Sequence, residues 1–129
     1  MVGLVVVSHS AKAAEGICEV AAEMGSAEAE IVPAGGDDDG GVGTSADRIR
    51  EAIEQARDDD GAVVLVDLGS AVMNAELAIE MLAVDDVRIA DAPILEGTLN
   101  AAVTAAGSKA TLDSVVEAAE EAREYRKLN

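Results

Sequence analysis

Residues 2–10 read Val-Gly-Leu-Val-Val-Val-Ser-His-Ser. The first six are apolar and mostly β-branched, which predicts a short buried strand over residues 2–7. An amphipathic helix is predicted after the three polar residues, and Gly25 is expected to end it because glycine is a common helix terminator. The inner face of this helix is formed by apolar residues at spacings of three and four: Ala14, Ile17, Cys18, Ala21 and Met24.

The rest of the chain repeats this alternation of short apolar runs and helical patterns. Further strands are predicted over residues 28–34, 62–66 and 86–90. Four more helices are predicted from apolar residues at helical spacing or from alanine-rich sequence: one with Ile49, Ile53 and Ala56 inside; one with Val72, Ala75, Ile79 and Leu82 inside; one over about residues 97–107; and one from about Thr111 to Arg123 with Leu112, Val115, Val116 and Ala119 inside. The first could be capped by Thr44, Ser45 or Asp47, and Pro93 is placed in the turn before the third.

This order of elements predicts an α/β fold, an open and mostly parallel four-stranded sheet with helices on both faces. At 129 residues, the chain is expected to form a single domain over residues 1–129. In such folds ligands bind at the carboxyl ends of the strands, so those positions are searched for function.

The composition is strongly acidic, with 26 Asp and Glu residues against 9 Lys and Arg residues and a net charge of −17. So few cations make a basic face for nucleic acid or an anionic membrane improbable, and neither partner is expected. The acid excess is interpreted as a solvated surface in a salt-rich cytoplasm, where ions screen the self-repulsion. The sequence starts without a secretory leader, so a cytoplasmic location is expected. The lone Cys18 is interpreted as a core residue.

The one histidine of the chain, His9, lies at the end of a predicted strand. His9 follows the first strand, and a neutral imidazole is a competent nucleophile at physiological pH. Asp67 ends the third strand, which is expected to neighbour the first, so its carboxylate could fix the histidine tautomer. Helix N-termini bind phosphate through free N–H groups, and two are expected here, one at Ser10 and one at Gly69-Ser70-Ala71. The residues therefore predict a site where a phosphoryl group could be held on His9.

Other kinds of site are not indicated. The loop Gly35–Gly43 is rich in glycine and aspartate, but its spacing does not match an EF-hand, and a solvated loop is the favoured interpretation. Neither a Walker A sequence nor a G-x-G-x-x-G sequence is present, so direct nucleotide binding is not predicted. One histidine and one cysteine make zinc coordination improbable, and no metal site is expected.

Several short strings along the chain resemble one family. They occur in this order: Val5-Val-Val-Ser-His-Ser10, Ala14-Glu-Gly16, Gly43-Thr44, Val66-Asp-Leu-Gly-Ser-Ala71 and Ala92-Pro-Ile-Leu-Glu-Gly-Thr-Leu99. The resemblance, which runs from residue 2 to about 107, is to the phosphotransferase subunits of dihydroxyacetone kinases, the DhaM family. That family is related to the mannose-type IIA domains (EIIA) of the sugar phosphotransferase system (PTS), and the resemblance implies their three-layer α/β sandwich.

The resemblance also implies a specific activity, that of a phosphotransferase with a phosphohistidine intermediate and no tightly bound cofactor. His9 would receive a phosphoryl group from an HPr-like donor and pass it to ADP in a partner kinase subunit, while a third subunit binds dihydroxyacetone. Asp67 would lie beside the histidine, and Gly69 and Ser70 in the adjacent loop. Family members commonly form homodimers. Because some members continue into donor domains, a chain that ends at Asn129 is expected to use separate donors.

Two alternatives remain open from the sequence. One is a mannose-type IIA domain that passes its phosphoryl group to a sugar-transport IIB protein. The other is a non-catalytic binding or regulatory module with the same fold, in which His9 is never covalently modified; a His9 that points into the core, far from Asp67, would support it.

Overall fold

Four parallel strands form one sheet in the order β2-β1-β3-β4 in the computed structural model, which describes residues 1–25 and 29–129. The strands are β1 (Gly3–Ser8), β2 (Ile31–Gly35), β3 (Ala62–Val66) and β4 (Val87–Ile89). β1 and β3 are buried along their whole length, as their unbroken apolar runs require. The predicted α/β class is confirmed, and so is the pairing of the first strand with the third.

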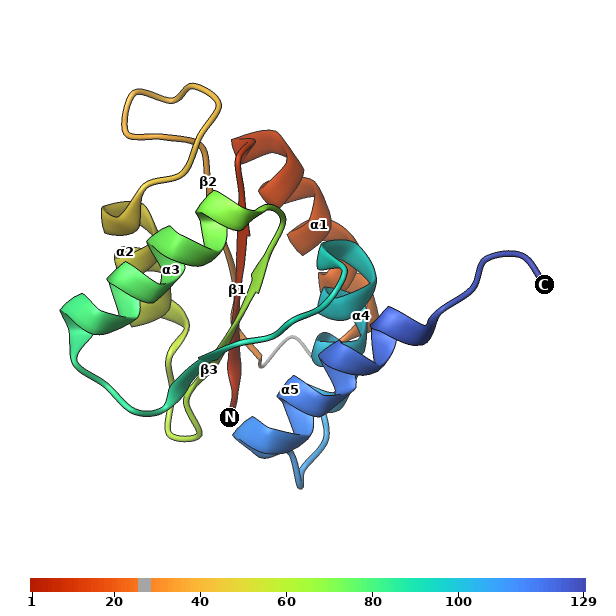
Figure 1. Cartoon of the computed structure of the whole chain (residues 1–129). Helices are drawn as coiled ribbons and strands as arrows, with labels where there is room; N and C mark the ends of the chain where they lie inside the picture. Colours follow the sequence, from red (N-terminus) through yellow and green to blue (C-terminus); the bar gives the residue numbers. More distant parts are fainter. Residues whose placement is uncertain (26–28) are drawn as a thin grey trace.

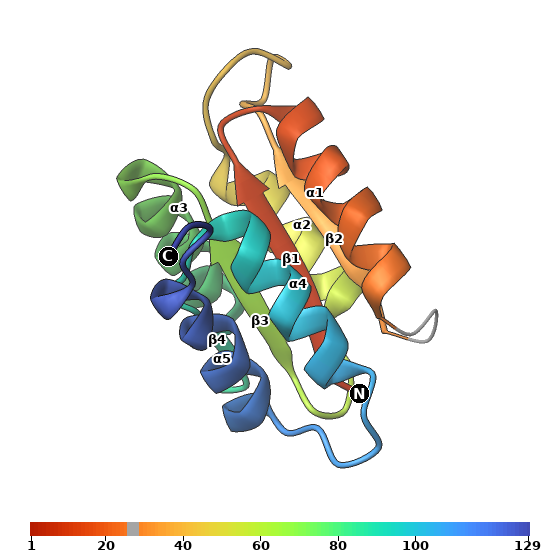
Figure 2. The same cartoon turned by 90° about the vertical axis from the view of Figure 1, so that its right-hand side faces the viewer.

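Helices cover both faces of the sheet (Figures 1 and 2). One face carries α2 (Ala46–Ala56) and α3 (Gly69–Leu82); the other carries α1 (Ala11–Met24), α4 (Ile94–Ala105) and α5 (Leu112–Glu121), which ends in a short 3-10 turn. Alternate residues of the central strands supply the two cores. Val5 and Val64 pack under α2 and α3, whereas Leu4 and Leu65 pack under α4 and α5.

Side-chain caps begin three of the helices. The hydroxyl of Ser10 accepts from the backbone N–H of Ala13 at the start of α1, and Ser45 and Thr111 do the same for α2 and α5. Of the three predicted candidates for the cap of α2, Ser45 is the one used. These caps fix where each helix leaves the sheet, and therefore where the strand-end side chains stand.

Several predicted boundaries are corrected by the structure. The first strand runs one residue later than predicted, and the second begins at Ile31 and extends to Gly35; residue 28, where it was predicted to start, lies outside the described residues. The fourth strand is shorter than predicted, because only Val87–Ile89 pair with β3. The helix predicted to begin near residue 97 begins at Ile94, because Pro93 occupies its N-cap position and its fixed φ suits a helix start.

The predicted inner face of α1 is correct except at its end. Ala14, Cys18 and Ala21 are buried, but Met24 is 53% exposed. Contact with α4 is made instead by the C-cap residue Gly25, where a Cβ would lie 3.0 Å from the carbonyl oxygen of Ala102. Among the described residues, no helix has the length and apolar character needed to cross a membrane.

Candidate functional site

Two strand ends meet at the carboxyl edge of the sheet and bring His9 beside Asp67. Val7 of β1 pairs with Val66 of β3, so the residues that follow each strand end are neighbours. The two side chains are about equally shielded, with exposed fractions of 21% for His9 and 20% for Asp67. The predicted proximity of these two residues is therefore observed.

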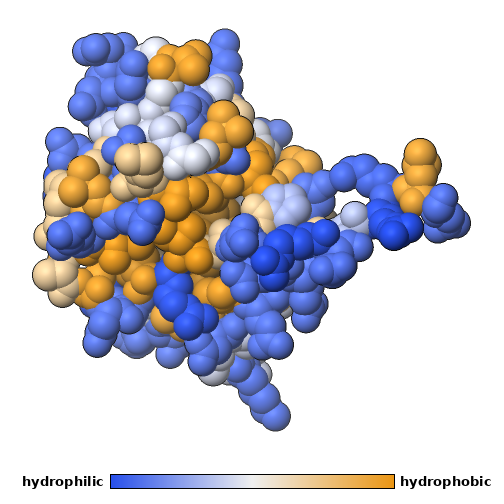
Figure 3. Space-filling view, viewed as in Figure 1, coloured by the Kyte–Doolittle hydropathy of each residue, from blue (hydrophilic) through white to orange (hydrophobic). Residues whose placement is uncertain are grey.

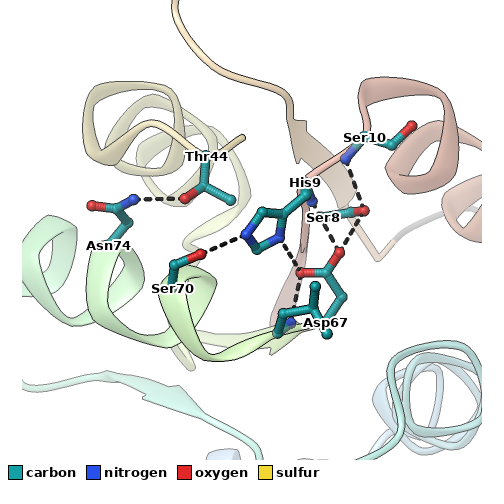
Figure 4. Close-up of polar contacts among 8 residues, drawn as sticks. Ser8, His9, Ser10, Thr44, Asp67, Ser70 and Asn74 are labelled. Atoms are coloured by element: carbon teal, nitrogen blue, oxygen red, sulfur yellow. Dashed lines mark hydrogen bonds and ion pairs between the residues drawn. The ribbon is translucent and has the colours of Figure 1, made fainter. Parts of the chain in front are cut away.

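The Asp67 carboxylate is the centre of the hydrogen-bond network (Figure 4). Its Oδ2 atom accepts from the Ser8 hydroxyl and from the backbone N–H of His9, both at 2.9 Å. Its Oδ1 atom lies 2.9 Å from Nδ1 of the His9 ring and accepts from the backbone N–H of Leu68 at 2.7 Å. Both carboxylate oxygens therefore have two partners, which fixes the side chain in one orientation.

These contacts also set the charge of the carboxylate. Partial burial acts to raise the pKa of Asp67, but the hydrogen bonds from His9, Ser8 and Leu68 together outweigh it and hold the pKa below the usual carboxyl value. Asp67 is therefore ionised at neutral pH and can only accept hydrogen bonds. In a neutral His9 ring, Nδ1 must then carry the proton and donate it to Oδ1, leaving the lone pair on Nε2.

The Nε2 side of the ring faces the start of α3. Ser70, in the first turn of that helix, places its hydroxyl in hydrogen-bond contact with Nε2, and Figure 4 shows the ring held between Ser70 and Asp67. Ser70 and Gly69 are both exposed. Nε2 thus faces the exposed start of α3, while Nδ1 is anchored to Asp67 at the end of β3.

The two helix N-termini at this edge differ. In α1 the Ser10 hydroxyl accepts from Ala13, so this side chain serves the helix and makes no hydrogen bond with the His9 ring among the described residues. In α3 no described side chain caps the helix, and the N–H groups of Gly69 and Ser70 have no intrahelical partner. The N–H of Ala71 donates to the carbonyl of Leu68 at 2.9 Å, and the Ala71 side chain is buried. Of the residues predicted to bind phosphate, Gly69 and Ser70 are the best placed.

Three residues that contribute to the hydrogen bonds around His9 and the start of α3 were not predicted from the sequence. Ser8 is 3% exposed and holds Asp67 from the side of β1. Thr44 and Asn74 form a hydrogen bond of 2.6 Å across the gap between the loop after β2 and α3. A serine as the last residue of a buried strand was a usable signal for Ser8, whereas the contact of Thr44 with Asn74 depends on a loop path that no sequence pattern specifies.

The other titratable candidate, Cys18, is not part of this site. It packs with Val6 and Ala14 beneath α1, as predicted for a core residue. Burial, together with the charge of Glu15, raises the pKa of its thiol to about 11. The thiol therefore stays protonated at neutral pH and is a poor nucleophile.

The sequence matches the model of the family "PTS system fructose IIA component" over residues 3–119. It is 44% identical over 122 residues to the PEP-dependent dihydroxyacetone kinase phosphoryl donor subunit DhaM of Escherichia coli (strain K12), covering 90% of this chain and 26% of that relative. The DhaM subunit of dihydroxyacetone kinase 2 from Listeria innocua is 38% identical over 106 residues, covering 80% of this chain and 85% of that relative. The chain thus spans about a quarter of the length of the first relative and most of the second.

Solved structures share the fold. A crystal structure of a protein of unknown function matches with a TM-score of 0.80 and 31% identity, covering 100% of both chains. The phosphotransferase system component EIIA from Streptococcus agalactiae matches with a TM-score of 0.69 and 16% identity, covering 95% of this chain and 92% of the other. By its family match and its relatives, the chain belongs to the family of the PTS system fructose IIA component, among the DhaM proteins.

Proposed function

We propose that this chain is a phosphohistidine carrier that accepts a phosphoryl group on Nε2 of His9 and donates it onward for the phosphorylation of dihydroxyacetone. One observation carries the proposal. An ionised Asp67 accepts from Nδ1 of His9 at 2.9 Å, which leaves the lone pair on the nitrogen that faces the surface. The names of the curated relatives, phosphoryl donor subunits of dihydroxyacetone kinases, support the choice of pathway.

The transfer onto His9 is a simple displacement. The Nε2 lone pair forms a bond to phosphorus while the N–P bond of the donor phosphohistidine breaks, and the donor imidazole takes back its electron pair. No proton is exchanged with solvent, since Nδ1 keeps its hydrogen on the Asp67 side. The ring gains positive charge as the new bond forms, and the Asp67 carboxylate stabilises that charge. Asp67 is thus assigned the role of fixing the tautomer and balancing charge.

The start of α3 is proposed to hold the transferred group. The Ser70 hydroxyl, which donates to Nε2 before transfer, can turn to donate to a phosphoryl oxygen after it. The N–H groups of Gly69 and Ser70 point beyond the helix and can donate to the other oxygens. Ser10 and Ala71 remain predicted members of this phosphate site. N–H and hydroxyl donors can therefore hold a dianion here, so that the site does not require a lysine or arginine.

The donor is proposed to be an HPr-like protein, and the acceptor ADP held in a partner kinase subunit. In the second step the Nε2–P bond breaks and the β-phosphate oxygen of ADP bonds to phosphorus, which forms the ATP that phosphorylates dihydroxyacetone in the third subunit. In this scheme the chain needs no tightly bound cofactor of its own. Its role is that of a phosphotransferase component, reset at each turn by the return of His9 to the free imidazole.

A second candidate function is transfer to a sugar-transport IIB protein, and the match to the fructose IIA family model favours keeping it. The same His9 chemistry would serve both acceptors, so only the acceptor distinguishes them. The third alternative, a binding or regulatory module, would have been supported by a His9 far from Asp67; the 2.9 Å contact gives it no such support.

A homodimer is proposed as the assembly. Figure 3 shows a broad apolar area on the face that carries α3 and the free edge of β4. It includes a groove of about 640 Å³ whose apolar lining comes chiefly from Val66, Leu68, Val72, Ile79 and Ile89. A second copy would shield these side chains from water. Light scattering at micromolar concentration in concentrated KCl tests this: twice the chain mass supports the dimer, and the single-chain mass excludes it.

The central test is intact-protein mass after incubation with enzyme I, HPr and phosphoenolpyruvate in concentrated KCl, for wild type and His9→Ala. We expect an acid-labile gain of one phosphoryl group in wild type and none in His9→Ala, with matched melting temperatures. Adding ADP and dihydroxyacetone together with the kinase and dihydroxyacetone-binding subunits should remove the group and yield dihydroxyacetone phosphate.

Incubation of the phosphorylated chain with each acceptor separates transfer to the kinase subunits from transfer to a IIB protein. Loss of the phosphoryl group to a IIB protein, but not to the kinase subunits, would support the sugar branch. No gain of mass in wild type, with donors shown to be active in the same salt, would reject a phosphohistidine carrier altogether.

A further inference from the structure

The loop between β2 and α2 is tied to the site at three points. The N–H of Gly36 donates to the carbonyl of Ser8 at 3.2 Å, and the N–H of Gly43 donates to the carbonyl of His9 at 2.9 Å. Next to Gly43, the Thr44 hydroxyl accepts from the Asn74 side-chain amide at 2.6 Å. The loop therefore connects the backbone of the histidine directly to α3.

Asn74 and Ser70 stand on the same face of α3. They are four residues apart in the helix, so their side chains lie one above the other. Ser70 contacts Nε2 of His9, and Asn74 contacts the loop that holds the His9 carbonyl. Figure 4 shows both contacts side by side along the helix. The histidine, the loop and α3 thus form a closed ring of contacts.

Hydrogen bonds within the loop hold its backbone in one conformation. The Asp37 carboxylate accepts from the N–H groups of Asp39 at 3.0 Å and Gly41 at 2.8 Å, and its own N–H donates to the carbonyl of Gly41. Gly43 adopts a φ of 148°, which other residues rarely take. The Asp37 side chain therefore braces the loop backbone, and the favoured interpretation of a merely solvated loop is incomplete.

We propose that Thr44 and Asn74 are positioning residues, which hold the start of α3 at the distance from His9 that phosphoryl transfer requires. The inference rests on the proposed function. Neither side chain makes a hydrogen bond with His9 among the described residues, and both act through Ser70 and the N–H groups of the first helical turn. A displacement of α3 of about 1 Å can cost on the order of a hundredfold in rate, because transfer depends on alignment of donors with the moving phosphoryl group.

The experiment measures steady-state phosphoryl flow from phosphorylated HPr through the full chain to ADP and dihydroxyacetone in the presence of the kinase subunits, with the chain at limiting concentration. Thr44→Val and Asn74→Leu remove the polar atoms with nearly unchanged shape, and Thr44→Ser keeps the hydroxyl. We expect each of the first two to lower kcat roughly tenfold, with KM for the donor little changed. Thr44→Ser should restore most of the rate. The double variant Thr44→Val/Asn74→Leu should be no worse than either single change, because both break the same contact.

A matched control and a second readout make the result specific. Tyr125→Phe removes a hydrogen bond of similar length, 2.7 Å to Asn100, far from His9, and should leave kcat unchanged. Because His9 is the only histidine, its two ring nitrogens give the only imidazole signals in histidine-labelled protein. Its Nε2 signal should shift in Thr44→Val in the same direction as in Ser70→Ala, if the contact with Ser70 is loosened.

Two outcomes would overturn the positioning role: wild-type kcat in both variants, or additive losses in the double variant. An unchanged Nε2 signal in folded variants would also do so, even where transfer cannot be measured. If wild type accepts no phosphoryl group, the proposed function fails instead; if wild type accepts it and the variants match it, only the positioning role fails.

Discussion

The two ends of the parallel sheet are held together by different means. At the carboxyl end, polar side chains converge: the Asp67 carboxylate links Ser8 to His9, and the other ring nitrogen of His9 contacts Ser70. At the amino end, backbone packs on backbone. A Cβ added at Gly3 would lie 1.9 Å from the carbonyl oxygen of Ala56, which leaves room for glycine only.

The ion pairs of the amino end are at the surface. The terminal amine lies 3.1 Å from Asp60, and Arg57 lies 2.6 Å from Asp86, in each case between partly exposed side chains. Such pairs contribute little to stability, whereas close packing contributes much. The difference teaches that close packing at the amino end of the sheet secures the fold. The carboxyl end, whose strands are joined through hydrogen bonds to an ionised carboxylate, is therefore free to carry chemistry.

The largest expected effect tests the carboxyl end: Asp67→Asn should lower the rate of phosphoryl acceptance. The amide can donate to Nδ1 of His9, which favours the tautomer with the proton on Nε2 and removes the attacking lone pair. We expect the rate of phosphoryl acceptance to fall by on the order of 10² to 10³. Asp91→Asn is the control, since Asp91 also follows a strand but is 86% exposed and pairs with Arg123; it should accept at the wild-type rate. A wild-type rate in Asp67→Asn would remove Asp67 from the mechanism.

The same substitution should also change how the free energy of unfolding depends on pH. The pKa of Asp67 is lower in the folded protein than the usual value of about 3.9, so the folded state binds fewer protons. The carboxylate therefore stabilises the fold above that pH, and the stabilisation is lost as the pH falls through the folded pKa. Urea unfolding of wild type and Asp67→Asn should show a gap in unfolding free energy that is constant above about pH 5 and shrinks below pH 4.

Sequence reasoning reached the pair at the centre of the site because parallel strand ends are predictable. An unbroken apolar run fixed the third strand at residues 62–66, and its pairing with the first strand put Asp67 next to His9. The predicted ends of helices and strands were less accurate where a single residue decides them. Pro93 was assigned to a turn, yet it occupies the N-cap of α4, and both positions suit proline equally well in a sequence.

One contact beside the site was out of reach of the sequence for a physical reason. The bond between Thr44 and Asn74 joins segments 30 residues apart, and it depends on the path of a loop that Asp37 braces from within. Glycine and aspartate in a loop are compatible with many paths. Residues with a role through backbone geometry, rather than through reactive groups, are therefore the ones that the sequence alone does not identify.

A smaller effect, confined to stability, is expected at the amino end. Gly3→Ala should lower the unfolding free energy by about 2 kcal/mol or more, because the backbone at Ala56 must move to admit the methyl group. The control is Gly16→Ala on the exposed face of α1, where a Cβ meets nothing within 4 Å. That change should raise stability by about 0.5–1 kcal/mol. Equal stability of the two variants would contradict the assignment of tight packing to this end.

The smallest effect is expected from the surface ion pair of the amino end. Arg57→Gln removes one of only 9 Lys and Arg residues from a chain with net charge −17, so it should weaken the fold slightly at low salt through self-repulsion. In about 1 M KCl the Debye length is about 3 Å, and the two proteins should melt together. Wild type itself should gain stability as KCl rises. A melting temperature that stays flat or falls with KCl would show that the acid excess is no adaptation to salt, and that the amino end is secured by packing alone.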